Sequence, residues 1–432
     1  MTGGTLRADN GRASFLDSFK QALLTPKFID AGFITIVLLI LSGPSWPFET
    51  NRILNLAELA LLSAAMIWIR WNEIRIRIPF VVLPLLAWMT LSAVWSDSPM
   101  DTLKGALLMG AVAFVAILIG GSFGLRTIAM AVGWLGIAAL VLSIGLALVN
   151  PSVAFVAESY NRGALEGIYP HRNVLAFVLV IGIGGLLATS VNSKMAQFAR
   201  VAAVVALWGG IWWTNSSTAK VSASLLLLTG FVLWAIRRRE VSQRPRVLLI
   251  LGMVVMLLIV VVAFNFETVT GLLGRDSTLT NRTLIWHLVL ESASAQPWIG
   301  FGWDAVWSHG AQVGDSIRQS VQWDFDHAHN GYLDVLIQTG IIGTTLLAIT
   351  VGWAAWIAIS RAIGDHDWND TWPALLITSV FIYDMVETAS TRPLGWGLLI
   401  IALTACASPR LAFTFWPSRS VRLTNRALPQ AP

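Results

Sequence analysis

Long apolar segments restrict the fold of this 432-residue chain more than any other feature, and many of them run for about 18 residues or more. A helix of about 20 residues crosses the hydrocarbon core of a bilayer, and only helices or closed barrels satisfy their backbone hydrogen bonds there. The segments are too long and too uniform for barrel strands. The sequence therefore predicts an all-α polytopic membrane protein.

The composition agrees with this prediction. Only 12% of the residues are charged, whereas a soluble domain carries roughly 25%. A net charge of +5 and a pI near 9.7 are compatible with a nucleic-acid partner. Lys and Arg lie beside the apolar segments, however, where membrane topology accounts for them, so we expect no nucleic-acid partner. The single cysteine, Cys406, excludes an internal disulfide.

Twelve membrane spans are predicted, in two groups. A tail (1–27) precedes spans one to nine (28–265), and a large loop (266–330) precedes spans ten to twelve (331–411) and a second tail (412–432). The spans are expected near 28–44, 53–70, 79–95, 103–123, 127–149, 173–190, 197–214, 220–236, 247–265, 331–360, 372–388 and 394–411. No cleavable signal peptide is apparent, so the first span is expected to be a retained signal-anchor.

Basic residues set the orientation. With a cytoplasmic N-terminus, 20 of the 29 Lys and Arg residues fall on inside connections and 9 on outside connections. This bias predicts that both termini are cytoplasmic and that the loop 266–330 is outside. In the N-terminal tail, residues 13–24 place Phe15, Phe19 and Leu23 on one helical face. They are expected either to form an interfacial helix or to belong to a disordered tail.

Polar residues gather on the predicted outer connections. Five of the six histidines fall in or beside them: His171, His287, His309, His327 and His329. The densest cluster is 323–330, directly before the tenth span. A histidine beside a helix start can act as a general base because its neutral form is available near pH 7. Gly340 and Gly343 follow on one helical face and are expected to let another helix approach closely.

The spacing of these residues resembles a known signature. His329-Asn330, nine residues, Gly340, two residues and Gly343 is similar to the pattern of the O-antigen ligase and polymerase superfamily. The resemblance covers roughly residues 160–345 and includes four further elements: Gly167–Asn173, Ser216–Lys220, Asn281–Trp286 and Pro297–Trp303. Asn281 stands where glycine is usual, and Arg172 replaces the more common Lys or Pro.

The resemblance implies a bacterial inner-membrane glycosyltransferase with about twelve spans and a large periplasmic loop. Its members take glycans from undecaprenyl diphosphate on the periplasmic side by inverting transfer, without a metal or other cofactor. The acceptor is another glycan (polymerase) or the lipid A core (ligase). The pattern looks closest to exopolysaccharide polymerases of the succinoglycan type, so polymerase is favoured. A chain-length regulator is an expected partner by analogy.

Two residues are expected to be catalytic. His329 is the candidate base, with a structural helix cap as its alternative role. Arg282 is the candidate group for the departing diphosphate, because residues 281–294 are predicted to form a short amphipathic helix whose first turn would hold it. Thr280 or Asn281 would cap this helix. The alternative for Arg282 is a lipid headgroup partner.

Further residues are candidates for binding the diphosphate or glycan: Arg172, Arg162, Asn173, Lys220, Ser217, Asn330 and Trp286. The arginines are alternatively surface charges, Lys220 a snorkelling lysine and the tryptophans an interfacial belt. His327, Asp384 and Glu387 are expected to support the catalytic residues. On a helix the rings of His327 and His329 would diverge, and the two acids are alternatively a hydrated helix end. Arg392 is an outer candidate without motif support.

Two rival hypotheses remain at this point. Asp324, Asp326, His327 and His329 offer metal ligands within six residues, although four such close ligands rarely converge on one ion. A secondary transporter or lipid-linked glycan flippase would also have about twelve spans. Its polar residues are expected near mid-membrane, whereas here they cluster at the outer surface.

Overall fold

A computed structural model describes residues 26–45, 52–70, 74–157, 161–250, 253, 282–308, 310–364, 366–407 and 412–414. The expected interfacial helix at 13–24, most of the ninth span and the outer loop before Arg282 lie outside the described residues.

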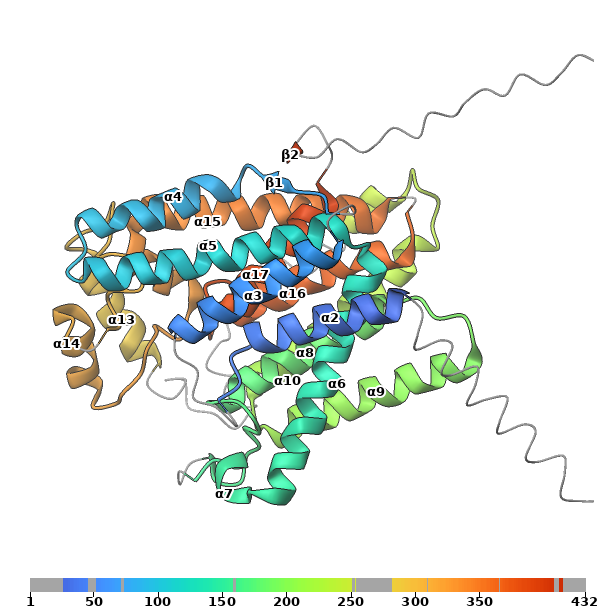
Figure 1. Cartoon of the computed structure of the whole chain (residues 1–432), viewed down its shortest axis with the longest axis horizontal. Coiled ribbons are helices and arrows are strands. Elements are labelled where there is room, and N and C mark those ends of the chain that lie inside the picture. Colours follow the sequence, from blue (N-terminus) through green and yellow to red (C-terminus); the bar gives the residue numbers. More distant parts are fainter. Residues whose placement is uncertain are drawn as a thin grey trace, which may run out of the picture.

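The described residues form a bundle of helices with one short pair of strands (Figure 1). The helices are α2 (Pro26–Leu41), α3 (Arg52–Arg70), α4 (Val82–Leu91), η1 (Ser92–Val94), α5 (Pro99–Ser122), α6 (Leu125–Val149), α7 (Pro151–Ala154), α8 (Arg172–Ala188), α9 (Lys194–Trp213), α10 (Ser217–Arg237), α13 (Arg282–Ala293), α14 (Gln312–Val321), α15 (Gly331–Ile363), η3 (Trp368–Thr371), α16 (Trp372–Asp384) and α17 (Pro393–Cys406). The strands β1 (Arg77–Pro79) and β2 (Ala412–Thr414) pair antiparallel, with Ile78 opposite Phe413.

Among the described residues, five helices are long and apolar enough to cross a membrane: α5, α6, α9, α10 and α15. Shorter apolar helices of 10–17 residues accompany them, including α8 and α17. The chain is thus mostly helical, as predicted for a polytopic membrane protein.

Small residues let the central helices pack closely. A Cβ atom on Gly136 of α6 would lie 2.9 Å from the Cα of Gly182 on α8, so these two backbones nearly touch. Gly120 of α5 likewise faces the carbonyl of Ile401 on α17, 2.7 Å from where a Cβ would stand. Close backbone approach through small residues is how helices associate in a bilayer, where apolar burial adds little.

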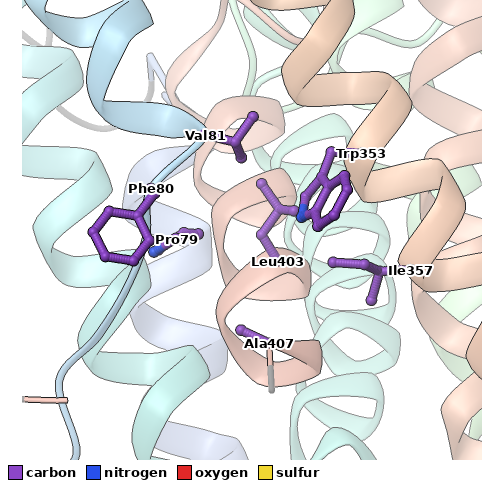
Figure 2. Close-up of a pocket in the computed structure, with 7 residues that line it drawn as sticks. All are labelled: Pro79, Phe80, Val81, Trp353, Ile357, Leu403 and Ala407. Atoms are coloured by element: carbon purple, nitrogen blue, oxygen red, sulfur yellow. The ribbon is translucent and has the colours of Figure 1, made fainter. Parts of the chain in front are cut away.

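The connections gather at two ends of the bundle (Figure 1). At the loop end, where α13 and α14 lie, hydrogen bonds join distant connections, such as Ser42 to Tyr169 (2.9 Å) and Trp95 to the Ile299 carbonyl (3.2 Å). At the strand end, β1 pairs with β2 and Arg126 donates to the Ser190 carbonyl. An apolar pocket of about 270 Å³ opens beside β1, lined by residues such as Pro79, Trp353 and Leu403 (Figure 2).

The predicted role of Gly340 is wrong in one respect. Gly340 has φ +66° and interrupts α15, and the backbone that approaches it belongs to a loop rather than to a helix. The amide of Ile341 donates to the Pro297 carbonyl and that of Gly302 to the Gln338 carbonyl, both at 2.8 Å. The motif segment 297–303 thus satisfies backbone groups that the break in α15 exposes. Gly343 does face a helix, since a Cβ there would lie 3.1 Å from Trp88 of α4.

Candidate active site

The segment 322–330 places two histidines beside the start of α15. Gln322 ends α14 in the left-handed conformation (φ 55°), and no helix forms between it and Gly331. Asn330 then caps α15, because its Oδ1 accepts from the amides of Tyr332 and Leu333 at 3.0 and 3.1 Å. His329, with φ 49°, is the residue directly before this cap. The expectation that the rings of His327 and His329 diverge is therefore wrong, since their centroids lie 4.2 Å apart.

A small apolar core holds this segment against α13, α14 and α15. It buries Phe325 and Ala328 with Ile285 of α13 and Ile317 of α14. The Trp286 indole donates to the Ala328 carbonyl (3.2 Å), directly before His329. The helix predicted at 281–294 is confirmed as α13. The Trp286 side chain on this helix holds the backbone of the segment 322–330 at Ala328.

Asp334, which was not among the predicted site residues, holds the backbone of the segment 322–330 at Ala328. Its carboxylate accepts from the Ala328 amide at 3.0 Å, from the Trp307 indole at 2.8 Å and from Gln338 at 3.0 Å. The residue is buried on the first turn of α15. An acidic residue at the start of an apolar span was the available signal, because such residues are rare without a polar partner.

Glu387 is the point at which the site converges. Its Oε1 accepts from the guanidinium of Arg282 and from the side-chain amide of Asn173. Its Oε2 lies 3.3 Å from His329 Nδ1 and 3.5 Å from His327 Nε2. Donors from α8, α13 and the segment 322–330 therefore meet on one carboxylate. The side chains of Glu387 and His329 are each 6% exposed, so this cluster is shielded from solvent.

The turn after α16 carries this carboxylate. The predicted eleventh span extended to residue 388, but α16 ends at Asp384, so Glu387 lies in a turn rather than in the helix. The Asp384 carboxylate accepts from the amides of Ala389 (2.7 Å) and Ser390 (3.0 Å) and so holds the turn closed. Asn330 donates to the Met385 carbonyl (3.0 Å), and Arg282 to that of Val386 (2.5 Å).

His329 is held neutral at ordinary pH. Burial lowers the pKa of its imidazole to about 4, despite the opposing hydrogen bond to Glu387. A carboxylate can only accept, so Nδ1 carries the proton and the lone pair lies on Nε2. Nε2 is buried and has no hydrogen-bond partner among the described residues. The Trp323 indole stacks on the same ring, with centroids 5.0 Å apart and planes at 10°.

His327 has the opposite tendency. Burial lowers the pKa of its imidazole, but hydrogen bonds to Asp326 and Glu387 outweigh this and raise the pKa overall. Its Nδ1 lies 2.6 Å from the Asp326 carboxylate, which also accepts from Arg392 at 3.1 Å. Burial would raise the pKa of Asp326, yet His327 and Arg392 hold it well below its usual value. The sequence had given Arg392 only as an outer candidate without motif support.

Other predicted residues lie at the loop end with different contacts. Arg172 opens α8 and donates to the carbonyls of Thr214 (3.2 Å) and Asn215 (2.7 Å). Lys220 lies 3.4 Å from the Asn215 side chain and 4.4 Å from the Trp212 ring centroid. Ser217 is the first residue of α10, and Arg162 is exposed in a turn. Among the tryptophans of residues 282–330, Trp303 and Trp307 are buried, whereas Trp298 and Trp323 are exposed.

The structure brings together only some of the four residues that the metal-enzyme hypothesis named as ligands. His327, His329 and Glu387 have potential ligand atoms within 4.8 Å of one another. Asp324 is exposed, and Asp326 binds the far nitrogen of His327. The converging set is thus two histidines and a glutamate about 60 residues away, rather than four neighbours in the sequence.

Comparisons with known proteins agree with the motifs. Residues 202–348 match the family described as O-antigen ligase, a range that includes Arg282 and His329 but not Asn173 or Glu387. The chain is 23% identical over 357 residues to the exopolysaccharide production protein ExoQ of Rhizobium meliloti (strain 1021), covering 75% of this chain and 77% of that protein. It is 22% identical over 256 residues to the general O-oligosaccharyltransferase of Acinetobacter baylyi (strain ATCC 33305 / BD413 / ADP1), covering 53% of this chain and 42% of that protein. Residues 202–348 therefore carry a domain of the O-antigen ligase family, and the two relatives support the O-antigen ligase and polymerase superfamily that the motifs of this chain resemble.

Proposed function

We propose that this protein transfers or polymerises undecaprenyl-diphosphate-linked oligosaccharide on the periplasmic face of the bacterial inner membrane. The observation that carries the proposal is the meeting of His329 and Arg282 on the buried carboxylate of Glu387. A neutral imidazole and a fixed guanidinium are the two groups that glycosyl transfer from a lipid diphosphate requires: a base for the acceptor and positive charge for the leaving group.

In the proposed reaction, His329 Nε2 accepts the proton of an acceptor hydroxyl. The hydroxyl oxygen attacks the anomeric carbon, and the bond from that carbon to the diphosphate oxygen breaks with inversion. Undecaprenyl diphosphate leaves with the bonding electron pair, and Arg282 at the N-terminus of α13 stabilises its charge. Glu387 orients His329 by accepting from Nδ1, which keeps the lone pair on Nε2.

The topology is part of the proposal. The loop end is the periplasmic face, the loop 266–330 is periplasmic, and both termini are cytoplasmic. The distribution of basic residues supports this orientation: Arg237, Arg238, Arg239, Arg244 and Arg246 cluster at the strand end. Arg237 and Arg244 donate there to the carbonyls of Asp367 and Gly364.

Polymerase activity is favoured over ligase activity. The relative named for exopolysaccharide production aligns with 75% of this chain, whereas the oligosaccharyltransferase aligns with 53%. In the polymerase reaction the acceptor is a second lipid-linked glycan. In the ligase reaction it is a lipid A core. The partners we expect are therefore these glycans, membrane lipids and a chain-length regulator.

Reconstitution tests the proposal. The purified protein in liposomes is given undecaprenyl-diphosphate oligosaccharide, with and without a lipid A core acceptor and in the presence of EDTA. We expect longer lipid-linked glycans and release of undecaprenyl diphosphate in EDTA, because no step uses a metal. Movement of the labelled glycolipid across the bilayer without a covalent product would instead support the flippase hypothesis. Loss of product in EDTA would support the metal-enzyme hypothesis.

A further inference from the structure

We propose that His327 Nε2, His329 Nδ1 and Glu387 Oε2 form a binding site for a transition-metal cation such as Zn²⁺, and that the bound cation inhibits the protein. Binding of the cation does not depend on the proposed reaction. Inhibition does rest on it, because inhibition acts through His329 as the base.

The geometry of the three ligand atoms carries the binding step. Glu387 Oε2 lies 3.3 Å from His329 Nδ1 and 3.5 Å from His327 Nε2. Each of the three residues offers a ligand atom within 4.8 Å of those of the other two. Bonds of about 2.1 Å to Zn²⁺ separate neighbouring ligand atoms of a tetrahedral site by about 3.4 Å. The two distances from Glu387 Oε2 to the histidine nitrogens therefore already match the spacing between ligand atoms in a tetrahedral zinc site.

The surroundings of His327 also match those of a metal ligand. Its other ring nitrogen, Nδ1, lies 2.6 Å from the Asp326 carboxylate. Histidines that bind metals usually donate their second N–H to such a carboxylate, which fixes the tautomer and raises the basicity of the ligand nitrogen. Two imidazoles and one carboxylate form a set that suits Zn²⁺, Ni²⁺ or Cu²⁺ rather than Mg²⁺ or Ca²⁺. A water molecule would complete a tetrahedron.

The charges nearby limit the affinity. Arg282 binds Oε1 of the same Glu387 carboxylate, and Arg392 binds Asp326. These two guanidiniums repel a divalent cation, so the site is expected to bind more weakly than a structural zinc site. Weak, reversible occupancy is what an inhibitory site requires, since the cation must leave for the protein to work.

Inhibition follows from the tautomer of His329. A neutral imidazole that coordinates a cation through Nδ1 must carry its proton on Nε2. In the structure Nδ1 faces Glu387 and Nε2 is the nitrogen that would accept the proton of the acceptor hydroxyl. A cation bound at Nδ1 thus places a proton on the atom that has to act as the base.

The experiment titrates the purified full-length protein, first stripped with EDTA, with Co²⁺ as a spectroscopic probe and then with Zn²⁺ by calorimetry. His327→Gln and Glu387→Gln each remove one ligand. The matched control is His287→Ala, because His287 is 76% exposed on α13 and lies 3.9 Å from Glu291, where it offers only a surface site. Elution of each variant as a monodisperse species by size exclusion checks that it is folded.

We expect one Co²⁺ with tetrahedral ligand-field absorption in the wild type and in His287→Ala. Affinity should fall by at least about 10-fold in the two ligand variants. Equal affinity in all four proteins, or the absence of ligand-field absorption in the wild type, would overturn the site. In the transfer assay Zn²⁺ should inhibit, and EDTA should restore activity. Binding without inhibition would overturn the inhibitory role alone, whereas binding to a protein that transfers no glycan would overturn the proposed function and leave the site intact.

Discussion

Replacing Glu387 with glutamine is the most informative single change to the proposed mechanism. The amide has nearly the shape of the carboxylate but only one acceptor oxygen. In the wild type, Oε1 accepts from Arg282 and Asn173, and Oε2 faces His329 and His327. Either orientation of the amide therefore turns its NH₂ group toward donors. An NH₂ group facing His329 forces Nδ1 to accept, which moves the proton to Nε2 and removes the base.

The expected loss is that of general-base catalysis, about 10²- to 10⁴-fold in kcat. The assay is release of undecaprenyl diphosphate by the reconstituted protein at saturating donor. Glu387→Asp is the matched variant, since it keeps the charge on a shorter side chain and should retain more activity than Glu387→Gln. A kcat for a folded Glu387→Gln protein within about twofold of the wild type would refute the orienting role of this carboxylate.

Three further predictions concern the leaving-group contact of Arg282, the protonation of His329 and the break in α15 at Gly340. Arg282→Ala should lower the rate by about 100-fold or more, because a charge contact to the leaving diphosphate is lost, and an unchanged rate would remove Arg282 from the reaction. Because burial lowers the pKa of His329 to about 4, kcat/KM should stay level as the pH falls from 7 to about 5 and then decline as the base is protonated, whereas a midpoint near 6.5 would contradict a buried base. Gly340→Ala should destabilise the protein by at least about 2 kcal/mol, because φ is +66° and the new Cβ would meet the Trp298 backbone, whereas Gly352→Ala on the same helix meets nothing within 4 Å and should be neutral or stabilising in a thermal melt.

Local sequence patterns predicted the helical parts of the site well. The start of α15 and the helix carrying Arg282 follow from the spacing of apolar residues. The cap of α15 was placed one residue too early, at His329, whereas Asn330, expected to bind substrate, is the residue that caps the helix. The sequence predicted the motif around Gly300 and Gly302 but not the structural role of its glycines. Both residues have positive φ, and they bring the loop against the break at Gly340. Spacing along the chain predicts that such glycines matter without showing which backbone they meet.

Convergence on Glu387 could not be predicted in the same way. Glu387 is 58 residues from His329, 105 from Arg282 and 214 from Asn173 along the chain. Only the packing of α8, α13, α15 and α16 brings these side chains together. The sequence named Glu387 as a supporting residue but placed it within a span that extended to residue 388, whereas α16 ends at Asp384. A hydropathy pattern does not resolve where a helix ends within a few residues.

The most direct test of the central claim is the turnover of His329→Ala beside His287→Ala. Both changes remove a histidine at the loop end, but His329 is buried against Glu387 whereas His287 is exposed on α13. In reconstituted liposomes with undecaprenyl-diphosphate oligosaccharide, we expect no product from folded His329→Ala and wild-type turnover from His287→Ala. Turnover by His329→Ala close to that of the wild type would contradict the assignment of this imidazole as the base.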